Sequence, residues 1–125
     1  MPLCRVRIKS FRCLASVELE LDQNRNYLFG NNGAGKTSFL EAIYLLGRGR
    51  SFRTHQNRRL IRRGDRGFSV YGEHHNDGRI QRLGVALGSD PLELRLDGEP
   101  AGGVATLARI LPVHVIEPNI HRLIE

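Results

Sequence analysis

The chain has 125 residues, a length that supports one modest hydrophobic core and predicts a single domain or lobe. Apolar residues make up 40% of the sequence and no apolar run approaches the ~18 residues of a membrane span, so the composition excludes a membrane-spanning class. Lysine and arginine number 19 against 13 acidic residues, and the net charge of +6 favours partners that carry phosphate or other negative charge.

The first two predicted elements are strands. Residues 4–11 (CRVRIKSF) and 16–22 (SVELELD) alternate apolar and polar side chains with a period of two, which is typical of half-buried strands. The link between them is short, so we expect an antiparallel pair. Arg5, Arg7 and Lys9 lie where a secretory signal would need apolar residues, and we therefore expect a cytoplasmic protein with no membrane contact.

A glycine-rich loop follows, between a third predicted strand and a helix. Residues 27–29 (YLF) form a short apolar run that ends at Gly30, and apolar residues recur at helical spacing from Phe39 until Gly47. Between them, residues 30–37 (GNNGAGKT) match the pattern GxxxxGK[ST] at every fixed position. In the order strand, loop, helix, this pattern predicts a P-loop that binds the phosphates of a nucleotide.

Each part of this loop has a predicted role in binding ATP and Mg²⁺. Glycines let backbone N–H groups turn toward the phosphates, and the positive end of the helix dipole adds attraction. The Lys36 ammonium is expected to reach the β- and γ-phosphates, and the Thr37 hydroxyl to ligate Mg²⁺. Asn32 either orients a water or phosphate oxygen or simply tolerates left-handed backbone. The predicted ATP-binding residues of the loop are Gly30, Asn31, Asn32, Gly33, Ala34, Gly35, Lys36, Thr37 and Ser38.

The segment after the helix is polar and rich in arginine, with a possible short helix over residues 56–63. Such a tract could neutralise several DNA phosphates, giving salt-sensitive binding with little sequence preference. The alternatives are a solvated basic face, and a GC-rich gene that replaces lysine with arginine, since only Lys9 and Lys36 are lysines. The predicted DNA contacts are Arg48, Arg50, Arg53, Arg58, Arg59, Arg62 and Arg63.

The second half of the chain is predicted to be a β meander. Residues 68–75, 79–87 and 92–98 are predicted strands, separated by turn signals rich in Asn, Asp, Gly and Pro. Residues 104–111 are a predicted short helix, and residues 112–118 (PVHVIEP) a further strand. Together with the P-loop, these elements predict an α/β fold of the P-loop NTPase class with an antiparallel β meander subdomain.

The cysteines and histidines do not indicate a metal site. Cys4 and Cys13 are too few for a disulfide framework, and we predict that both are small core residues. His74 and His75 are adjacent and should point to opposite faces of a strand, which separates them as ligands. We therefore predict no zinc site.

The stretch from residue 8 to residue 54 resembles the RecF family, within the ABC-type ATPases that include the SMC chromosome proteins. The shared features are Phe11-Arg12, Asn26, the P-loop and the Leu-Glu-Ala-Ile run at residues 40–43. Residues 47–53 (GRGRSFR) look like the RecF version and narrow the match to that family. The resemblance implies that residues 1–125 are lobe I of an ABC-type head, and that Arg12 contacts the nucleotide phosphates. The alternative for Arg12 is a solvated turn arginine.

The resemblance also implies a function. RecF proteins are ATPases of DNA replication, DNA repair and the SOS response; they bind single-stranded, double-stranded and gapped DNA and dimerise with ATP. They work with RecR and RecO to help load RecA. The Walker B acids and the ABC signature of the family are not recognisable here, so we expect part of a longer protein that hydrolyses almost no ATP by itself. His114 stands where the family commonly has the Gln of the Q-loop. Either His114 substitutes weakly for that Gln as a metal–water contact or the Q-loop aligns elsewhere, and His114 is not among the predicted site residues.

Three other interpretations remain open at the level of sequence. An SMC-like head would need long heptad segments after this lobe. A small P-loop kinase or GTPase would need an acceptor pocket or an Asn-Lys-x-Asp motif, and neither is recognisable in this sequence. A basic nucleic-acid module without ATP binding would leave the glycine-rich loop without a function.

Overall fold

The computed structural model describes residues 3–22, 35–88 and 91–111. The elements in chain order are β1 (Leu3–Phe11), β2 (Leu14–Glu20), α1 (Lys36–Arg48), the 3-10 helix η2 (Asn57–Leu60), β3 (Phe68–Asn76), β4 (Arg79–Leu87), β5 (Glu93–Leu96), β6 (Glu99–Pro100) and α2 (Val104–Ile110). The strands predicted at residues 27–29 and 112–118 lie outside the described residues.

Within the described residues, six strands form one antiparallel sheet in the order β2-β1-β3-β4-β5-β6. The predicted pairing of the first two strands is confirmed, with Arg7 opposite Glu18. The predicted meander is confirmed as well, since β3, β4 and β5 are consecutive neighbours. β1 joins these two parts because its other edge pairs with β3, although α1 and η2 lie between β2 and β3 in the chain.

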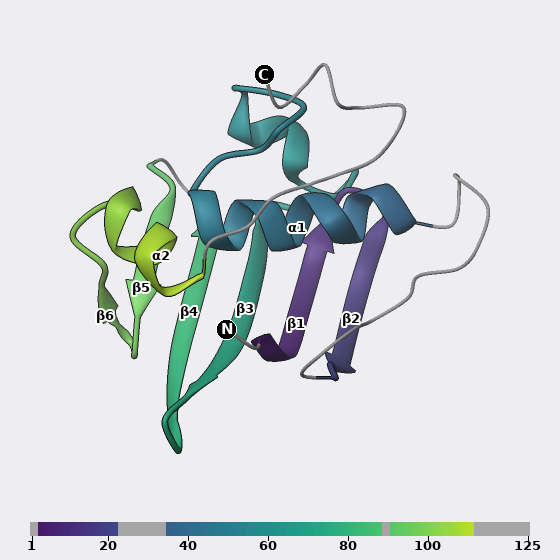
Figure 1. Ribbon diagram of the computed structural model, residues 1–125. Coiled ribbons are helices and arrows are strands. Elements are labelled where there is room, and N and C mark those ends of the chain that lie inside the picture. Colours follow the sequence, from purple (N-terminus) through teal and green to yellow (C-terminus); the bar gives the residue numbers. More distant parts are fainter. Residues whose placement is uncertain (1–2, 23–34, 89–90, 112–125) are drawn as a thin grey trace.

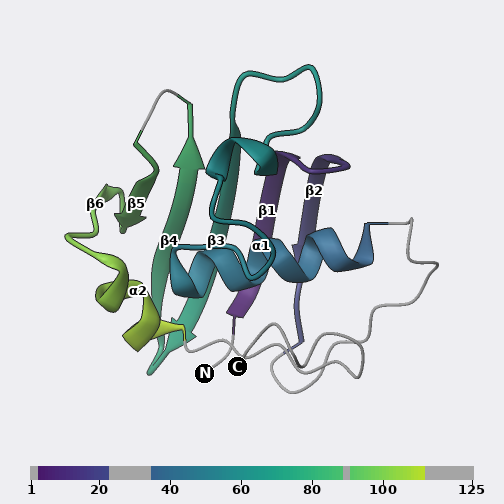
Figure 2. The same cartoon turned by 90° about the horizontal axis from the view of Figure 1, so that it is seen from above.

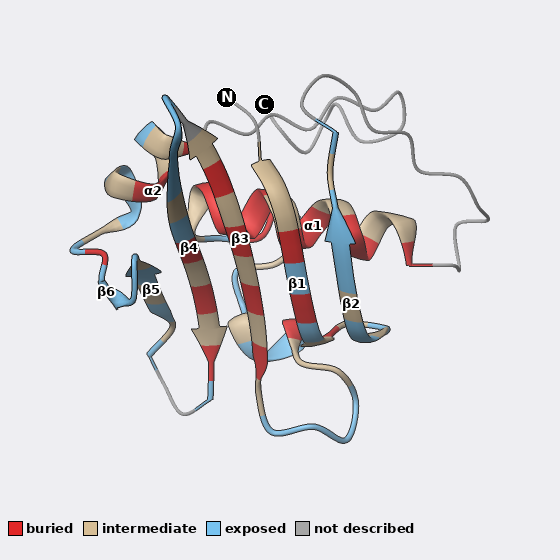
Figure 3. Ribbon diagram, turned by 90° about the horizontal axis from the view of Figure 1, so that it is seen from below, coloured by how far each residue is buried: buried red, intermediate tan, exposed pale blue. Residues whose placement is uncertain are grey.

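Helix α1 lies across one face of this sheet (Figure 1), and the view from above shows it running from beyond β2 to β4 (Figure 2). Seen from the other side, buried bands alternate with exposed or half-buried ones along the central strands (Figure 3). This is the period of two expected for a sheet with one covered face. The fully buried apolar side chains of the core, which come from the sheet, α1, η2 and α2, are Val6, Ile8, Phe11, Val70, Leu83, Val85, Leu87, Ala42, Leu45, Leu46, Leu60 and Leu107.

Gly72 on β3 allows the helix to approach the sheet closely. A Cβ atom at this position would lie 2.5 Å from Leu46 Cδ2 and 2.9 Å from Leu3 Cδ1. Both distances are below van der Waals contact, so a larger residue would push α1 away from the strand. A glycine in a strand interior weakens the strand, and here the close helix contact explains it.

The segment that follows α1 returns to the end of β1. The predicted helix over residues 56–63 is shorter than expected: only Asn57–Leu60 is helical, as a 3-10 turn. Beyond it, Ile61 forms a bridge with Phe11, and the Arg62 N–H donates to the Ser10 carbonyl at 2.7 Å. These backbone hydrogen bonds compete with a longer helix and fix the segment against the β1–β2 turn.

His74 and His75 lie on opposite faces of β3, as predicted. His74 is fully buried, and neither of its ring nitrogens has a hydrogen-bond partner in the described part of the chain. Burial lowers the pKa of His74 below its usual 6.5, and the electrostatic effect of the neighbouring His75 lowers it further, which favours the neutral ring.

The prediction for the cysteines is wrong for Cys13, which is exposed in the β1–β2 turn, and Cys4 is half-buried. Helix α1 is too short to cross a membrane, and no other described helix is long and apolar enough to do so.

Candidate functional site

The site begins at the first turn of α1. Gly35 caps the helix in the left-handed conformation (φ 88°, ψ 4°), and Lys36 and Thr37 are the first two helical residues. The predicted helix start is therefore confirmed, whereas the predicted loop residues 30–34 lie outside the described residues. No side chain caps this first turn and it contains no acidic residue, so its backbone N–H donors are not bonded to a side-chain oxygen of the turn.

The β1–β2 turn packs against this first turn of the helix. A Cβ atom on Gly35 would lie 2.8 Å from Leu14 Cδ2, so the cap position requires glycine for its space as well as for its positive φ. One residue earlier in the turn, the Cys13 thiol donates to Ser38 Oγ at 3.6 Å. The exposed position of Cys13 is thus explained by its place beside the helix start.

Arg12 is the third contact between this turn and the helix. Its backbone is left-handed (φ 53°), which is unfavourable for a residue with a side chain, and its N–H donates to the Leu60 carbonyl at 2.7 Å. Its guanidinium forms a two-pronged ion pair with Glu41 on α1, Nε to Oε1 at 2.9 Å and Nη2 to Oε2 at 3.1 Å. The unusual backbone and the ion pair together hold Arg12 in one position.

Glu41 collects two further donors from the segment after α1. The Ser51 hydroxyl donates to Oε2 at 2.5 Å, and Arg53 Nη2 donates to Oε1 at 2.5 Å. We call Arg12, Glu41, Ser51 and Arg53 the Glu41 cluster. The carboxylate is fully buried, whereas the side chains of Arg12 and Arg53 are 26% and 33% exposed. One buried negative charge therefore has two partly exposed positive partners.

The protonation of Glu41 follows from these contacts. Burial raises its pKa, but the hydrogen bonds from Arg53, Arg12 and Ser51 lower it by more, so the pKa lies below 4.5. Glu41 is therefore ionised at neutral pH, and the cluster carries a net charge of about +1.

The arginines predicted to contact DNA have different surroundings, and their contact with DNA stays a prediction. Arg53 belongs to the Glu41 cluster, and Arg48 lies over the Tyr44 ring at 5.5 Å. Arg62 is near Asp65, with 3.9 Å between Nη1 and Oδ2. The remaining members of the tract, Arg50, Arg58, Arg59 and Arg63, are exposed.

Of the predicted nucleotide-binding residues that are described, the structure brings four to one place. Gly35, Lys36, Thr37 and Ser38 form the helix start, and Arg12 lies alongside it through its pair with Glu41. The phosphate contact predicted for Arg12 stays a prediction, since its Nε and Nη2 atoms are bonded to Glu41.

Sequence reasoning did not assign a role to Glu41 or Ser51. The available signal was an acidic residue at position 41, on the buried side of a helix where most of the other residues are apolar. A charge on the buried face of a helix requires partners, and nearby arginines were the obvious candidates.

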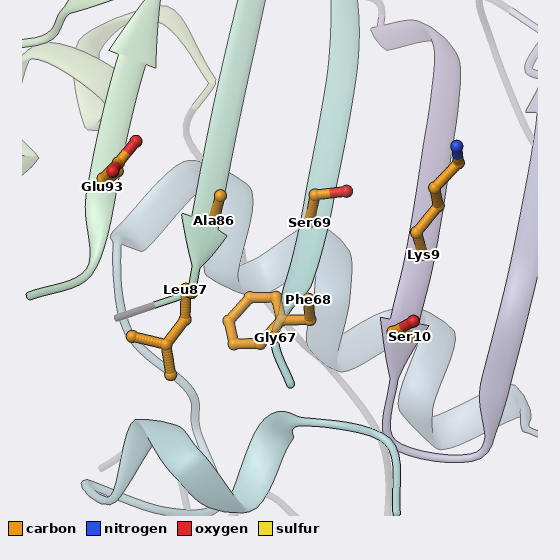
Figure 4. A pocket seen from close by; sticks show the side chains of 9 residues that line it. Lys9, Ser10, Gly67, Phe68, Ser69, Ala86, Leu87 and Glu93 are labelled. Carbon is orange, nitrogen blue, oxygen red and sulfur yellow. The ribbon is translucent and has the colours of Figure 1, made fainter. Parts of the chain in front are cut away.

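A second feature lies on the opposite, uncovered face of the sheet (Figure 4). It is a shallow hollow of about 350 Å³ where β1, β3, β4 and β5 run side by side, bordered by Lys9, Ser69, Ala86 and Glu93. On β1, Arg5 pairs with Glu20 and Arg7 pairs with Glu18. Lys9, on the same strand, instead lies opposite Ser16 on one side and Ser69 on the other. The hollow shares no residue with the helix start, and it is not part of the candidate nucleotide site.

The antiparallel sheet, with a helix across it that begins at Gly-Lys-Thr, is the arrangement of an ABC-type ATPase N-terminal lobe. Residues 2–81 match the model of the RecF/RecN/SMC N terminal domain family, so the chain belongs to that family. The resemblance found in the sequence is confirmed.

Curated relatives and solved structures agree with this assignment. The DNA replication and repair protein RecF of Shewanella pealeana is 37% identical over 125 residues, covering 99% of this chain and 35% of that protein. RecF of Actinobacillus pleuropneumoniae serotype 5b is 42% identical over 124 residues, covering 95% of this chain and 33% of that protein. The chain thus spans about a third of the length of these relatives.

Two solved structures of the recombination mediator protein RecF in the RecFOR pathway have the same fold. The structure described as RecF-ATPrS matches with a TM-score of 0.76 and 26% identity, over 84% of this chain and 29% of that one. The structure described as RecF-ATP matches with a TM-score of 0.75 and 27% identity, over 82% and 28%. These similarities favour the RecF interpretation over a small kinase or GTPase.

Proposed function

We propose that residues 1–125 are the ATP-binding lobe of a longer RecF-like protein of DNA replication and repair, with a fold of the P-loop NTPase class. The observation that carries the proposal is the helix start at Gly35, Lys36 and Thr37, which follows the sequence pattern of a P-loop and has no acidic residue in its first turn. The similarity to RecF structures described with ATP supports the choice of nucleotide.

The residues at the helix start fit a triphosphate with Mg²⁺. The uncapped N–H groups of the first turn and the Lys36 ammonium would bind phosphate oxygens, and the Thr37 hydroxyl would hold the metal ion. When bound, Mg²⁺ neutralises charge on the phosphates during phosphoryl transfer. ATP hydrolysis, and dimerisation driven by ATP, are proposed for the complete protein.

We also propose that the protein binds double-stranded and gapped DNA in the cytoplasm and helps load RecA together with RecR and RecO. The net charge of +6 and the exposed arginines after α1 support DNA binding. Because Arg53 is engaged by Glu41, the stronger candidates for phosphate contact are Arg59 and Arg63, which are exposed and whose side chains form no hydrogen bond or ion pair among the described residues.

The test of ATP binding is the substitution Lys36→Ala. Lys36 forms no ion pair among the described residues, so its loss should leave the fold intact. It removes a charge-assisted contact of about 1.5–3 kcal/mol, and we expect ATP affinity, measured by calorimetry, to fall at least tenfold. The matched control is Lys9→Ala, because Lys9 is the other lysine and lies on the far face of the sheet. Equal ATP affinity in the two variants would refute the proposal.

The test of DNA binding compares two double substitutions with the same loss of charge. If Arg59 and Arg63 contact the backbone, changing both to Gln should reduce the slope of log affinity against log salt by about 1.8. The control variant changes two exposed arginines on other elements, Arg79 and Arg109, to Gln. The measurement is fluorescence titration of a duplex at several salt concentrations. The same slope for both variants would place the DNA surface elsewhere.

A further inference from the structure

Glu41 is the fully buried acid of α1, and the contacts around it form a pattern that a simple stabilising pair does not explain. We propose that Glu41 is a positioning residue, which fixes the Arg12 guanidinium beside the first turns of α1 so that Arg12 can bind an anionic group held there. This inference rests on the proposed function, because the anion would be a phosphate of the bound nucleotide.

The turn that carries Arg12 also places Leu14 against Gly35 and Cys13 against Ser38. Three consecutive residues therefore contact the first two turns of the helix, since Arg12 pairs with Glu41. Glu41 is five residues after Lys36, a rise of about 7.5 Å along the helix axis. A guanidinium held by Glu41 therefore lies close to the helix start.

Arg12 is held along one edge of its guanidinium. Glu41 accepts from Nε and Nη2, which orients the planar guanidinium, and Nη1 has no hydrogen bond to any described residue. The side chain is 26% exposed, so this remaining donor atom belongs to a group that a ligand can reach. An arginine held on one edge of its fork keeps donors on the other edge for an anion.

The Glu41 cluster carries more positive charge than its buried carboxylate needs. A neutral pair would be enough to satisfy a buried carboxylate, yet Glu41 has two arginines and a hydroxyl. The surplus positive charge lies next to a helix N-terminus, where the dipole also favours an anion. Glu41 is itself fully buried, so it would act on the ligand only through the arginines.

The experiment is a double-mutant cycle on ATP affinity in the purified protein, with any natural flanking segments retained. We expect Glu41→Gln and Arg12→Gln each to weaken ATP binding by about tenfold, since each removes the oriented contact. The double variant should be no weaker than Arg12→Gln, because Glu41 would act through Arg12. Unchanged affinity in Glu41→Gln, or losses that multiply in the double variant, would overturn the proposal.

Glu18→Gln is the matched control, because Glu18 also pairs with an arginine but lies exposed on β2. The ATP affinity of this variant should equal that of the parent protein. If Glu41→Gln fails to fold, Arg12→Lys takes its place. Arg12→Lys keeps the charge and leaves Glu41 with Arg53 and Ser51, but it removes the fork that Glu41 orients. We expect the same tenfold loss, and parental affinity would overturn the proposal. Lys36→Ala distinguishes failure of the proposed ATP site from failure of the positioning role of Glu41. If Lys36→Ala lowers ATP affinity and Glu41→Gln does not, only the positioning role is refuted.

Discussion

Arginine–glutamate pairs occur in two different settings in this lobe. On the uncovered face of the sheet, Arg5 pairs with Glu20 and Arg7 with Glu18 across neighbouring strands, at 2.8 and 3.1 Å. These side chains are between 38% and 80% exposed. On the covered face, Glu41 is fully buried between Arg12 and Arg53. The same pair of residue types therefore has different physical consequences.

The exposed and the buried pairs differ in whether water can solvate the charges once a pair breaks. An exposed pair that breaks is solvated at once, so its net contribution is small and is screened by salt. A carboxylate that has left water must keep its hydrogen bonds, because an unpartnered buried charge is costly. The surface pairs follow from strand register, whereas the Glu41 cluster holds three separate segments together.

The largest expected effect is that of Glu41→Ala. Removing this carboxylate leaves two arginines without their shared partner and creates a cavity under α1, and we expect the free energy of unfolding to fall by about 3 kcal/mol. Glu18→Ala should cost less than about 1 kcal/mol. Urea unfolding of both variants measures the contrast, and similar losses would show that burial does not distinguish the two settings.

Ser51→Ala should have the next largest effect. Ser51 is 5% exposed, and its hydroxyl donates to Glu41 and accepts from the backbone N–H of Arg53 at 2.9 Å. The loss of a buried hydrogen bond to a charged group predicts a decrease of about 2 kcal/mol in the free energy of unfolding. Ser69→Ala is the control, because Ser69 lines the shallow hollow and its hydroxyl forms no hydrogen bond among the described residues. A loss no larger than that of the control would contradict the role of Ser51.

Low pH should lower the contribution of the Glu41 cluster to the free energy of unfolding. We expect this decrease to be smaller than the losses caused by Glu41→Ala and Ser51→Ala near neutral pH. The pKa of Glu41 in the folded chain is below 4.5, so its contribution to stability is fully present above that value and is lost as the pH falls through the lower, folded pKa. The difference in unfolding free energy between the parent and Glu41→Gln should stay constant from pH 7 to pH 5 and shrink below 4.5. A difference that already shrinks above pH 5 would contradict the lowered pKa.

The smallest effect is expected on the surface pairs. Glu18→Gln and Glu20→Gln should each change the free energy of unfolding by less than about 1 kcal/mol at low salt. At 1 M NaCl the Debye length is about 3 Å, so these differences should vanish. The effect of Glu41→Gln should persist at the same salt concentration, because solvent ions do not reach the buried carboxylate.

The sequence by itself determined the local elements and the family. Alternation with a period of two predicted the strands because side chains alternate along any extended backbone, and the prediction for residues 79–87 agrees with β4. The start of α1 followed from the Gly-Lys-Thr pattern, since a left-handed cap favours glycine. These signals need only neighbouring residues, so they can be recognised without knowledge of the fold.

The partners of Glu41 were decided only by the tertiary structure. Arg12 is 29 residues away in the chain, and Ser51 and Arg53 follow the end of the helix, so no local pattern links them. The same packing placed Cys13 outside the core and divided the arginine tract between the Glu41 cluster and the surface. The physical reason is that the partner of a charge depends on which segments the buried core brings together, and this core requires β1 to lie between β2 and β3.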